Sequence, residues 1–363
     1  MNRRTSLQTL SLASASTLVS PHTLLAATAP KKEKLGVALV GLGYYSTDLL
    51  APALLQTKHC YLTGIVTGTP AKAEAWKKQY NIPDKNLYSY QTFDQIANND
   101  DIDVVYVVLP PSMHEEYVVR AAKAGKYVWV EKPMAVTARE CQNMIDTCRK
   151  NKRVLTVGYR LHHEPNTQAY TKFLRDGSIG KIQMVTCSAG YFDGRTDHWK
   201  QKKEMGGGVM YDMGVYAIQG ARIATGEEPI ALTAQQYTTR PEVYKNGLDE
   251  TSMAQLEFPG GARAAIQTSY GMNMNFLHVT GQKGQLDMEP YSQYEGVRGT
   301  GSNGFKTDVP YKTPFQQMTQ MDNDARAILQ NTPVLVPGEE GLADIRVVEA
   351  IYKAAKEGKR VVL

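Results

Sequence analysis

Short runs of apolar, β-branched residues alternate with longer amphipathic segments in the first half of the chain. The apolar runs are continuous, which is typical of strands buried on both faces of a parallel sheet. They lie at residues 35–40, 61–66, 104–109, 127–130 and 154–157. The segments between them have the length and periodicity of crossover helices and lie at residues 49–56, 71–80, 114–124 and 138–150. This pattern predicts a doubly wound α/β fold that ends near Gly158.

The pattern changes after Gly158. Strands are expected at short spacing, joined by turn signals such as Pro259-Gly260-Gly261, at residues 181–189, 230–237, 251–258, 262–269, 277–280 and 285–288. Helices are expected at residues 165–175 and 209–224 and, after a loop that contains 299–304, at 315–330 and 342–356. We therefore expect a second, α+β domain with an open, mostly antiparallel sheet. Its last helices are expected to pack back on the first domain.

The first residues have the features of an export signal. Arg3 and Arg4 precede a weakly apolar stretch that runs to Leu25 and ends in Ala27-Thr28-Ala29. The stretch is too short and too polar to span a bilayer. We expect a twin-arginine signal peptide over residues 1–29, a dinucleotide-binding domain over 30–158, a substrate-binding and oligomerisation domain over 159–363, and a periplasmic location. Ser6 and Gln8 depart from the twin-arginine pattern, so an ordinary secretory signal is the alternative.

Composition fits a globular protein and is too polar for a membrane protein. The chain has 363 residues, of which 42% are hydrophobic and 21% charged, with a formal net charge of +5. Arg3 and Arg4 account for two of these five charges, and charges of both signs are interspersed along the rest. The sequence therefore favours neither nucleic-acid nor membrane partners. We interpret the run formed by Lys200, Lys202 and Lys203 as a solvated face.

Cysteine and histidine spacing gives no sign of a metal centre. The four cysteines lack a CxxC pair and are expected to be buried or inert thiols; they are Cys60, Cys141, Cys148 and Cys187. The histidines near the predicted site lack the spacing and acidic neighbours of metal ligands, so they are expected to be solvated or substrate-facing; they are His162, His163 and His198.

A glycine loop follows the first predicted strand directly and opens a helix, which is the context of a dinucleotide-binding motif. Gly41 permits the tight turn, and Gly43 lets the backbone approach a pyrophosphate at the helix N-terminus. Ser46 stands in place of the third glycine. The predicted contact residues of this loop are Gly41, Leu42, Gly43, Tyr44 and Tyr45.

The end of the second strand indicates which nucleotide is bound. An acidic residue there would hold a ribose 2′-hydroxyl and repel a 2′-phosphate, but residues 65–72 contain none. Thr67 and Lys72 offer a hydroxyl and an ammonium group that suit a 2′-phosphate. We therefore favour NADP over NAD, with Lys72 as a solvated first-turn residue in the alternative interpretation.

Two segments carry candidate catalytic groups. Glu131 and Lys132 stand at the carboxyl end of a predicted strand, where doubly wound folds bind ligands. Lys132 can orient a hydroxyl and stabilise an oxyanion, with Glu131 as its partner or as a ribose contact. Asp212 and Tyr216 follow a glycine-rich segment, and their spacing of four places both on one helix face. A Tyr serves as a base for a carbinol proton when a neighbouring ammonium group such as Lys132 stabilises the phenolate.

These motifs, together with Gly158-Tyr159-Arg160 and the segment 206–216, resemble the glucose-fructose oxidoreductase, inositol dehydrogenase and MocA family from about Leu35 to the end of the chain. The resemblance implies Lys132, Asp212 and Tyr216 as catalytic residues. It also implies cofactor contacts. Those near the nicotinamide or its ribose come from Leu109, Pro110, His114, Arg160 and Trp199. Tyr90 is expected near the adenine, and Tyr294 is a further implied contact. His114 is equally well explained as a helix-start residue. The resemblance also implies association through the open sheet, as a homodimer or homotetramer.

The predicted function is NADP-dependent oxidation of an aldose, with return of the hydride to a second sugar as an extension. One departure from the sugar-exchanging family members affects that extension, because only residues 30–34 separate the signal from the first strand, where those members have a cofactor-locking arm. The first alternative is a nicotinamide-dependent glycoside hydrolase of the same fold, which oxidises its sugar transiently. The second is a nucleotide-binding scaffold without activity.

Overall fold

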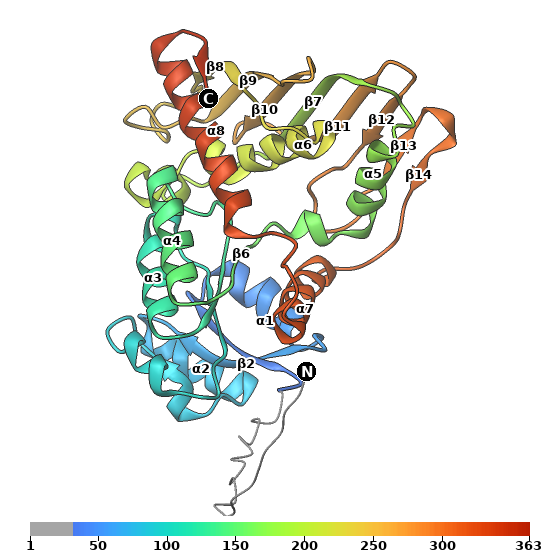
Figure 1. The fold of residues 1–363 in the computed structure, drawn as a ribbon. Coiled ribbons are helices and arrows are strands. Elements are labelled where there is room, and N and C mark those ends of the chain that lie inside the picture. Colours follow the sequence, from blue (N-terminus) through green and yellow to red (C-terminus); the bar gives the residue numbers. More distant parts are fainter. Residues whose placement is uncertain (1–31) are drawn as a thin grey trace, which may run out of the picture. The chain divides into compact units, whose positions relative to one another are not determined.

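The computed structural model describes residues 32–363, whose regular structure is built around two sheets (Figure 1). The predicted signal peptide and its cleavage position lie outside the described residues. Both sheets agree with the predicted fold class: the first is parallel, and the second is mostly antiparallel.

Within the described residues, the first sheet has six parallel strands in the order β3-β2-β1-β4-β5-β6, which is the order of dinucleotide-binding folds. The strands are β1 (Leu35–Val40), β2 (Cys60–Val66), β3 (Leu87–Tyr88), β4 (Val104–Val107), β5 (Tyr127–Val130) and β6 (Leu155–Val157). The helices between them are α1 (Ala51–Leu54), which continues a π-helical turn over Tyr45–Leu50, α2 (Pro70–Tyr80), α3 (His114–Lys123) and α4 (Ala138–Lys150).

Both faces of the first sheet are buried, as the continuous apolar runs predicted. Along β1, Val37 and Leu39 face one hydrophobic cluster, which includes residues of α1 and α7. The alternate residues Ala38 and Val40 face a second cluster, which includes residues of α3 and α4. Helices therefore cover both faces, and the carboxyl edge of the strands stays free for a ligand.

The second sheet has nine strands among residues 32–363, in the order β14-β13-β12-β11-β7-β10-β9-β8-β15. The neighbours β7 and β10 run parallel, and the other pairs run antiparallel. The strands are β7 (Ile182–Gly190), β8 (Ala231–Tyr237), β9 (Thr251–Glu257), β10 (Arg263–Ser269), β11 (Met274–Gly281), β12 (Gln285–Met288), β13 (Gly299–Gly301), β14 (Lys306–Thr307) and β15 (Val361–Val362). The helices are α5 (Pro165–Arg175), α6 (Val215–Thr225), α7 (Phe315–Gln330) and α8 (Gly338–Glu357).

Helix α6 packs on one face of the second sheet, and α7 and α8 connect this part of the chain to the first sheet (Figure 1). Met321 and Ala325 of α7 join the hydrophobic cluster under β1. Helix α8 contacts both α4 and β8. At its start, a Cβ on Gly338 would lie 2.9 Å from Ile145 Cγ1, so close packing there requires glycine.

The expectation of a loop at residues 299–304 is wrong. Gly299 and Gly301 belong to β13, which pairs with β12. A Cβ on Gly301 would lie 2.3 Å from Leu286 Cδ2, so the missing side chain is what permits this pairing. The two-residue strands β3, β14 and β15 were also not predicted, because strands this short have no periodicity of their own.

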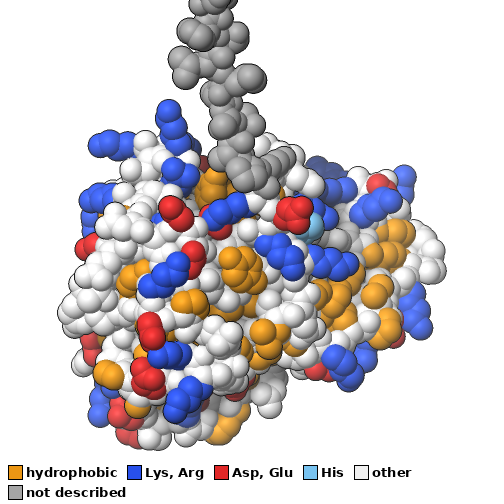
Figure 2. Space-filling model, turned by 90° about the horizontal axis from the view of Figure 1, so that it is seen from below, with side chains coloured by type: hydrophobic (Ala, Val, Ile, Leu, Met, Phe, Trp, Pro, Cys, Tyr) orange, Lys and Arg blue, Asp and Glu red, His pale blue; other side chains and the backbone are white. Residues whose placement is uncertain are grey.

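The prediction of buried thiols is confirmed, since Cys60, Cys141, Cys148 and Cys187 are all buried and free. Burial raises the pKa of the Cys60 thiol to about 12, which keeps it protonated and unreactive. Among the described residues, no cluster of three or more His, Cys, Asp or Glu side chains is arranged to hold a metal ion. No helix in residues 32–363 is long and apolar enough to cross a membrane. Figure 2 shows basic and acidic side chains interspersed on the face seen from below.

Candidate active site

The glycine loop forms a cradle at the carboxyl end of β1. Gly41 has φ +92°, and a Cβ there would lie 2.4 Å from the Val108 carbonyl oxygen, so only glycine fits. A Cβ on Gly43 would meet open space, which leaves the room that a pyrophosphate needs. Ser46 is buried, and its Oγ donates to the Gly41 carbonyl at 2.6 Å, so it closes the turn in place of the third glycine. These residues fit a dinucleotide.

The residues predicted to select the nucleotide lie beside this cradle. Lys72 Nζ donates to the carbonyl oxygen of Leu42 at 3.1 Å, which holds an exposed ammonium group against the glycine loop. Thr67 is buried at the end of β2, and its Oγ1 accepts from the Thr69 amide at 3.2 Å. The ring of Tyr90 lies against Gly68, where an added Cβ would be 3.1 Å away. The structure thus brings Thr67, Lys72 and Tyr90 together around one end of the cradle.

His114 is the first residue of α3, and its buried side chain links the segments that follow β4 and β5. Nε2 lies 2.7 Å from the Leu109 carbonyl oxygen, and Nδ1 lies 3.0 Å from that of Pro133 and 3.1 Å from that of Met134. Burial lowers the pKa of His114, against the opposing effect of these carbonyl groups. Leu109 and Pro110, which are half-buried, are therefore fixed relative to the segment after β5. His114 begins α3, as the helix-start interpretation predicted. Its ring contacts the Leu109 carbonyl oxygen and so supports the loop that contains Leu109 and Pro110.

Glu131 is buried just after β5 and does not pair with the Lys132 ammonium group, which contacts Asp212 instead. Its Oε1 accepts from the Tyr106 hydroxyl at 2.6 Å, and Oε2 accepts from the Lys132 amide at 3.2 Å. Burial raises the pKa of Glu131 to about 7, with Tyr106 and Lys132 acting in the opposite direction. A Cβ on Gly158 would lie 2.5 Å from Glu131 Oε1, which explains the glycine at the end of β6.

Lys132 and Asp212 form a buried ion pair across the two parts of the chain. Lys132 Nζ donates to Asp212 Oδ1 at 2.9 Å and to the Asp212 carbonyl oxygen at 2.7 Å. Their side chains are only 13% and 9% exposed. Burial opposes both charges, but the neighbouring groups outweigh it. Asp212, with a smaller effect of Tyr216, raises the pKa of Lys132, and Lys132 together with Lys200 holds the pKa of Asp212 far below its usual range. Asp212 is therefore a permanent carboxylate and a poor proton acceptor.

Tyr216 lies between two cations. Lys132 Nζ is 4.7 Å from the centre of its ring, and Arg160 Cζ is 5.2 Å away. Asp212 belongs to a π-helical turn, Met210–Gly214, and Tyr216 to the start of α6, so the helix is wider than predicted but the two residues still reach the same lysine. The predicted trio of Lys132, Asp212 and Tyr216 is thus assembled in one place.

Arg160 is fixed by the segment before β13. Its guanidinium donates to the carbonyl oxygens of Ser292 at 2.5 Å and Gln293 at 3.2 Å, and to Gln316 Oε1. The guanidinium carbon also lies 4.5 Å from the ring centre of Tyr294. The Tyr294 ring in turn lies 6.4 Å from that of Tyr45, which follows the glycine loop. The predicted contacts Arg160, Tyr294 and Tyr45 therefore connect Tyr216 to the cradle.

The interpretation of Lys200 as part of a solvated face is wrong. Its Nζ donates to Asp212 Oδ2 at 2.5 Å and to the Tyr191 hydroxyl at 3.1 Å, and its side chain is 19% exposed. Lys202 and Lys203 are exposed, as expected. Trp199 begins a short 3₁₀ turn, and its ring centre lies 5.8 Å from Lys200 Nζ. The indole that the resemblance implied as a cofactor contact therefore lies next to Lys200.

The histidines are less accessible than predicted. His163 is 1% exposed, and burial lowers its pKa to about 3. His162 is half-buried, with Nε2 2.9 Å from Gln219 Oε1 of α6. His163 is therefore a packing residue rather than a solvated one, and His162 is held against α6 by Gln219. His198 is half-buried, and its Nδ1 accepts from the Lys200 amide at 3.4 Å, which shapes the turn that carries Lys200.

Four site residues were missed by reasoning from sequence. Lys200, Tyr191 and Tyr270 surround Asp212, and the Tyr270 hydroxyl donates to Asp212 Oδ2 at 3.0 Å. Tyr106 supports Glu131 from β4. Tyr191 and Tyr270 directly follow β7 and β10, two parallel neighbours. This adjacency would have indicated that the two tyrosines lie together. The strand spacing in the sequence, however, does not reveal that β7 and β10 pair in parallel.

Comparison with known proteins agrees with this geometry. Residues 35–159 match the model of an oxidoreductase family with an NAD-binding Rossmann fold, and residues 171–363 match its C-terminal alpha/beta domain. The structure of an aldose-aldose oxidoreductase from Caulobacter crescentus, complexed with glycerol, superposes with a TM-score of 0.87 at 39% identity, covering 91% of this chain and 100% of that one.

Relatives at lower identity extend over most of the chain. A D-xylose 1-dehydrogenase [NADP(+)] of Haloarcula marismortui is 26% identical, covering 88% of this chain and 90% of the relative. An inositol 2-dehydrogenase of Rhizobium meliloti is 25% identical, covering 86% and 94%. A nicotinamide-dependent oxidoreductase acting on CH–OH groups is the class that the fold and the site define. The chain belongs to the glucose-fructose oxidoreductase, inositol dehydrogenase and MocA family.

Proposed function

We propose that the chain is an NADP-dependent sugar oxidoreductase that oxidises an aldose and returns the hydride to a second sugar. The observation that carries this proposal is the position of Tyr216 between Lys132 and Arg160, beside a dinucleotide cradle. The similarity to an aldose-aldose oxidoreductase supports the exchange between two sugars.

The residues of the chain then have distinct roles. A bound nicotinamide supplies the acceptor and donor of the hydride. Tyr216 takes the proton of the sugar hydroxyl, with Lys132 Nζ and Arg160 Cζ lying 4.7 and 5.2 Å from the centre of its ring. Lys132 orients that hydroxyl and is itself held by Asp212. In the reverse direction Tyr216 returns the proton to the carbonyl oxygen of the second sugar.

The preference for NADP rests on the end of β2. The segment after β2 carries Thr67 and Thr69 but no carboxylate, and Lys72 places an ammonium group against the glycine loop. A ribose 2′-phosphate would find a cation and hydroxyl groups there instead of a repelling charge. The D-xylose 1-dehydrogenase relative, whose name specifies NADP(+), supports this choice.

The test is an absorbance spectrum of the purified protein before and after mixing with a panel of aldoses. We expect a reduced-nicotinamide band that appears with one sugar and disappears with a second, and NADP rather than NAD on denaturing extraction. A cofactor that stays oxidised with every aldose would contradict sugar oxidation. Release of an aglycone from a glycoside, without net change in the cofactor, would instead indicate the hydrolase.

We also propose export through the predicted twin-arginine signal. That route carries folded proteins, so the cofactor can be bound before export. Retention of the cofactor would then be a condition for activity in a compartment without a nucleotide pool.

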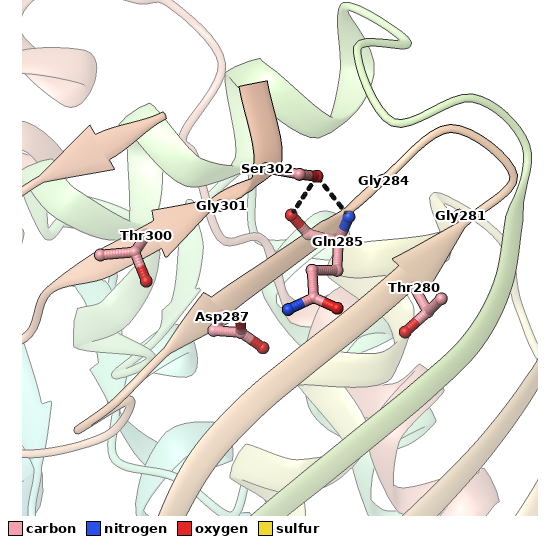
Figure 3. Close-up of a pocket in the computed structure, with 8 residues that line it drawn as sticks. All are labelled: Thr280, Gly281, Gly284, Gln285, Asp287, Thr300, Gly301 and Ser302. Atoms are coloured by element: carbon pink, nitrogen blue, oxygen red, sulfur yellow. Dashed lines mark hydrogen bonds between the residues drawn. The ribbon is translucent and has the colours of Figure 1, made fainter. Parts of the chain in front are cut away.

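We further propose a homodimer, or a tetramer built from it, formed through the open face of the second sheet. The strand alternation that buries Ala254 and Leu256 leaves Met253 on the other face, and exposed apolar side chains there are Met184, Tyr237 and Met253. Figure 3 shows a shallow hollow on the same face, lined by Thr280, Gly281, Gly284, Gln285, Asp287, Thr300, Gly301 and Ser302. Its Thr, Gln, Asp and Ser side chains suit the wet rim of an interface. Sedimentation as a monomer at micromolar concentration would contradict this assembly.

A further inference from the structure

Among residues 32–363, Lys200 is the one cation in direct contact with the Asp212 carboxylate that the proposed roles do not use. Its contacts come from three separate parts of the chain: Asp212 precedes α6, Tyr191 follows β7, and Tyr270, which shares Asp212 Oδ2 with it, follows β10. A lysine this deeply placed loses side-chain entropy and hydration, which a solvated lysine would keep. Its position is therefore specified by the fold.

The two oxygens of Asp212 have different partners. Oδ1 accepts from Lys132, and Oδ2 accepts from Lys200 and Tyr270. Without Lys200, one carboxylate and one ammonium group would cancel beside Tyr216. With Lys200, the cluster of Lys132, Asp212 and Lys200 carries one net positive charge.

We propose that Lys200 is a positioning residue of the reaction: it neutralises the outer oxygen of Asp212, so that the charge of Lys132 remains available to the Tyr216 phenolate. The inference rests on the proposed function of Tyr216 as the proton acceptor. Lys200 acts through Asp212 and needs no contact with the sugar.

Other charged and titratable groups lie around this cluster and contribute to its electrostatic potential. Arg195 Nη2 donates to the Tyr191 hydroxyl at 3.3 Å, and Asp193 pairs with Arg195 at 2.8 Å. His198 accepts from the Lys200 amide. On the far side of Tyr216 lie Arg160 and Tyr294, and Tyr45 and Tyr291 are further titratable groups that interact with Tyr216. The Arg195–Asp193 pair is neutral overall, so replacing Lys200 with a neutral residue removes the net positive charge of the cluster formed by Lys132, Asp212 and Lys200.

The protonation state of Lys200 can be changed in a pH series, because its pKa is lowered. Burial lowers its pKa, Asp212 opposes this, and Lys132 lowers it further. At high pH the cluster therefore loses the positive charge on Lys200. An arginine at the same position would stay protonated, because a guanidinium does not release its proton in this range.

The experiment compares Lys200→Gln and Lys200→Arg with wild type, using single-turnover cofactor reduction by the best aldose across a pH series. Gln can still donate to Asp212 but carries no charge. We expect Lys200→Gln to shift the acidic limb of the rate profile upward by about 1 pH unit and to lower the rate at neutral pH about tenfold, with unchanged cofactor binding. We expect Lys200→Arg to restore the acidic limb and to extend activity to higher pH.

Lys202→Gln is the matched control, since Lys202 is exposed and pairs with Asp197 at the surface. Thermal unfolding of each variant identifies loss of folding, and Lys200→Arg keeps the test valid if Lys200→Gln is unstable. A Lys200→Gln profile that matches wild type overturns the inference, as does a rate loss without a shift in pH dependence. Failure of the proposed function is distinguishable, because wild type itself would then show no sugar-dependent reduction.

Discussion

Replacing Tyr216 with Phe is expected to lower turnover by ~10²- to 10⁴-fold, the usual contribution of a general acid or base. The substitution removes only the hydroxyl group, so the ring keeps its contacts with Lys132 and Arg160. Cofactor binding should therefore survive. Single-turnover reduction of the bound cofactor, with cofactor content measured in parallel, provides the measurement.

Tyr211→Phe is the matched control, because Tyr211 precedes Asp212 but its hydroxyl donates to the Val136 carbonyl oxygen at 2.7 Å, away from the trio. Near-full turnover of Tyr216→Phe would mean that the proton leaves through another group. Asp212 is a weak candidate for that role, because two ammonium groups hold it as a carboxylate.

Much of the fold could be predicted because its signals are local. The strand at Tyr127–Val130 and the helices at Ala138–Lys150, Pro165–Arg175 and Phe315–Gln330 have the predicted bounds. In each case an uninterrupted apolar run, or a helical periodicity bounded by capping and breaking residues, coincides with the element. The capping box of Thr137 and Glu140 at the start of α4 is one such boundary.

The elements that were missed depend on contacts distant in sequence. β13 exists because two glycines let it approach β12, and a run of glycines by itself reads as a loop. The same limit applies to Lys200, whose sequence neighbours are two further lysines at the surface. Only the fold brings its ammonium group to Asp212.

The candidate site was predictable where a motif specifies the chemistry. The glycine loop, Lys132, Asp212 and Tyr216 lie in segments whose spacing relative to strands and helices already indicates a role. Buried polar residues that support the site give no such signal. His163 was expected to be solvated or substrate-facing, and Asp324 belongs to no motif, yet both are 1% exposed in the fold.

Asp324 leads to the second large effect, on stability. It lies on the buried side of α7, where Thr156 Oγ1 donates to its Oδ2 at 3.0 Å and Oδ1 has no hydrogen-bond partner within residues 32–363. Burial raises the pKa of Asp324 to about 8, with Thr156 opposing the shift. The carboxyl is thus expected to be protonated in the folded enzyme at neutral pH, and an unpaired carboxylate there would be costly.

We expect Asp324→Asn to become more stable than wild type as the pH rises from 4 to 8. Over that interval the unfolded wild-type chain releases the Asp324 proton while the folded chain keeps it. The free energy of unfolding of wild type therefore falls by roughly 1.4 kcal/mol per pH unit. The loss ends near pH 8, where the folded carboxyl also ionises, and amounts to roughly 4 to 5 kcal/mol over the whole interval. Asparagine does not titrate, and its amide oxygen still accepts from Thr156. Urea unfolding of both proteins across this range measures the difference, with Asp176→Asn, at an exposed position, as the control. Unfolding free energies that run parallel for wild type and Asp324→Asn would show that the folded protein already stabilises the ionised carboxylate.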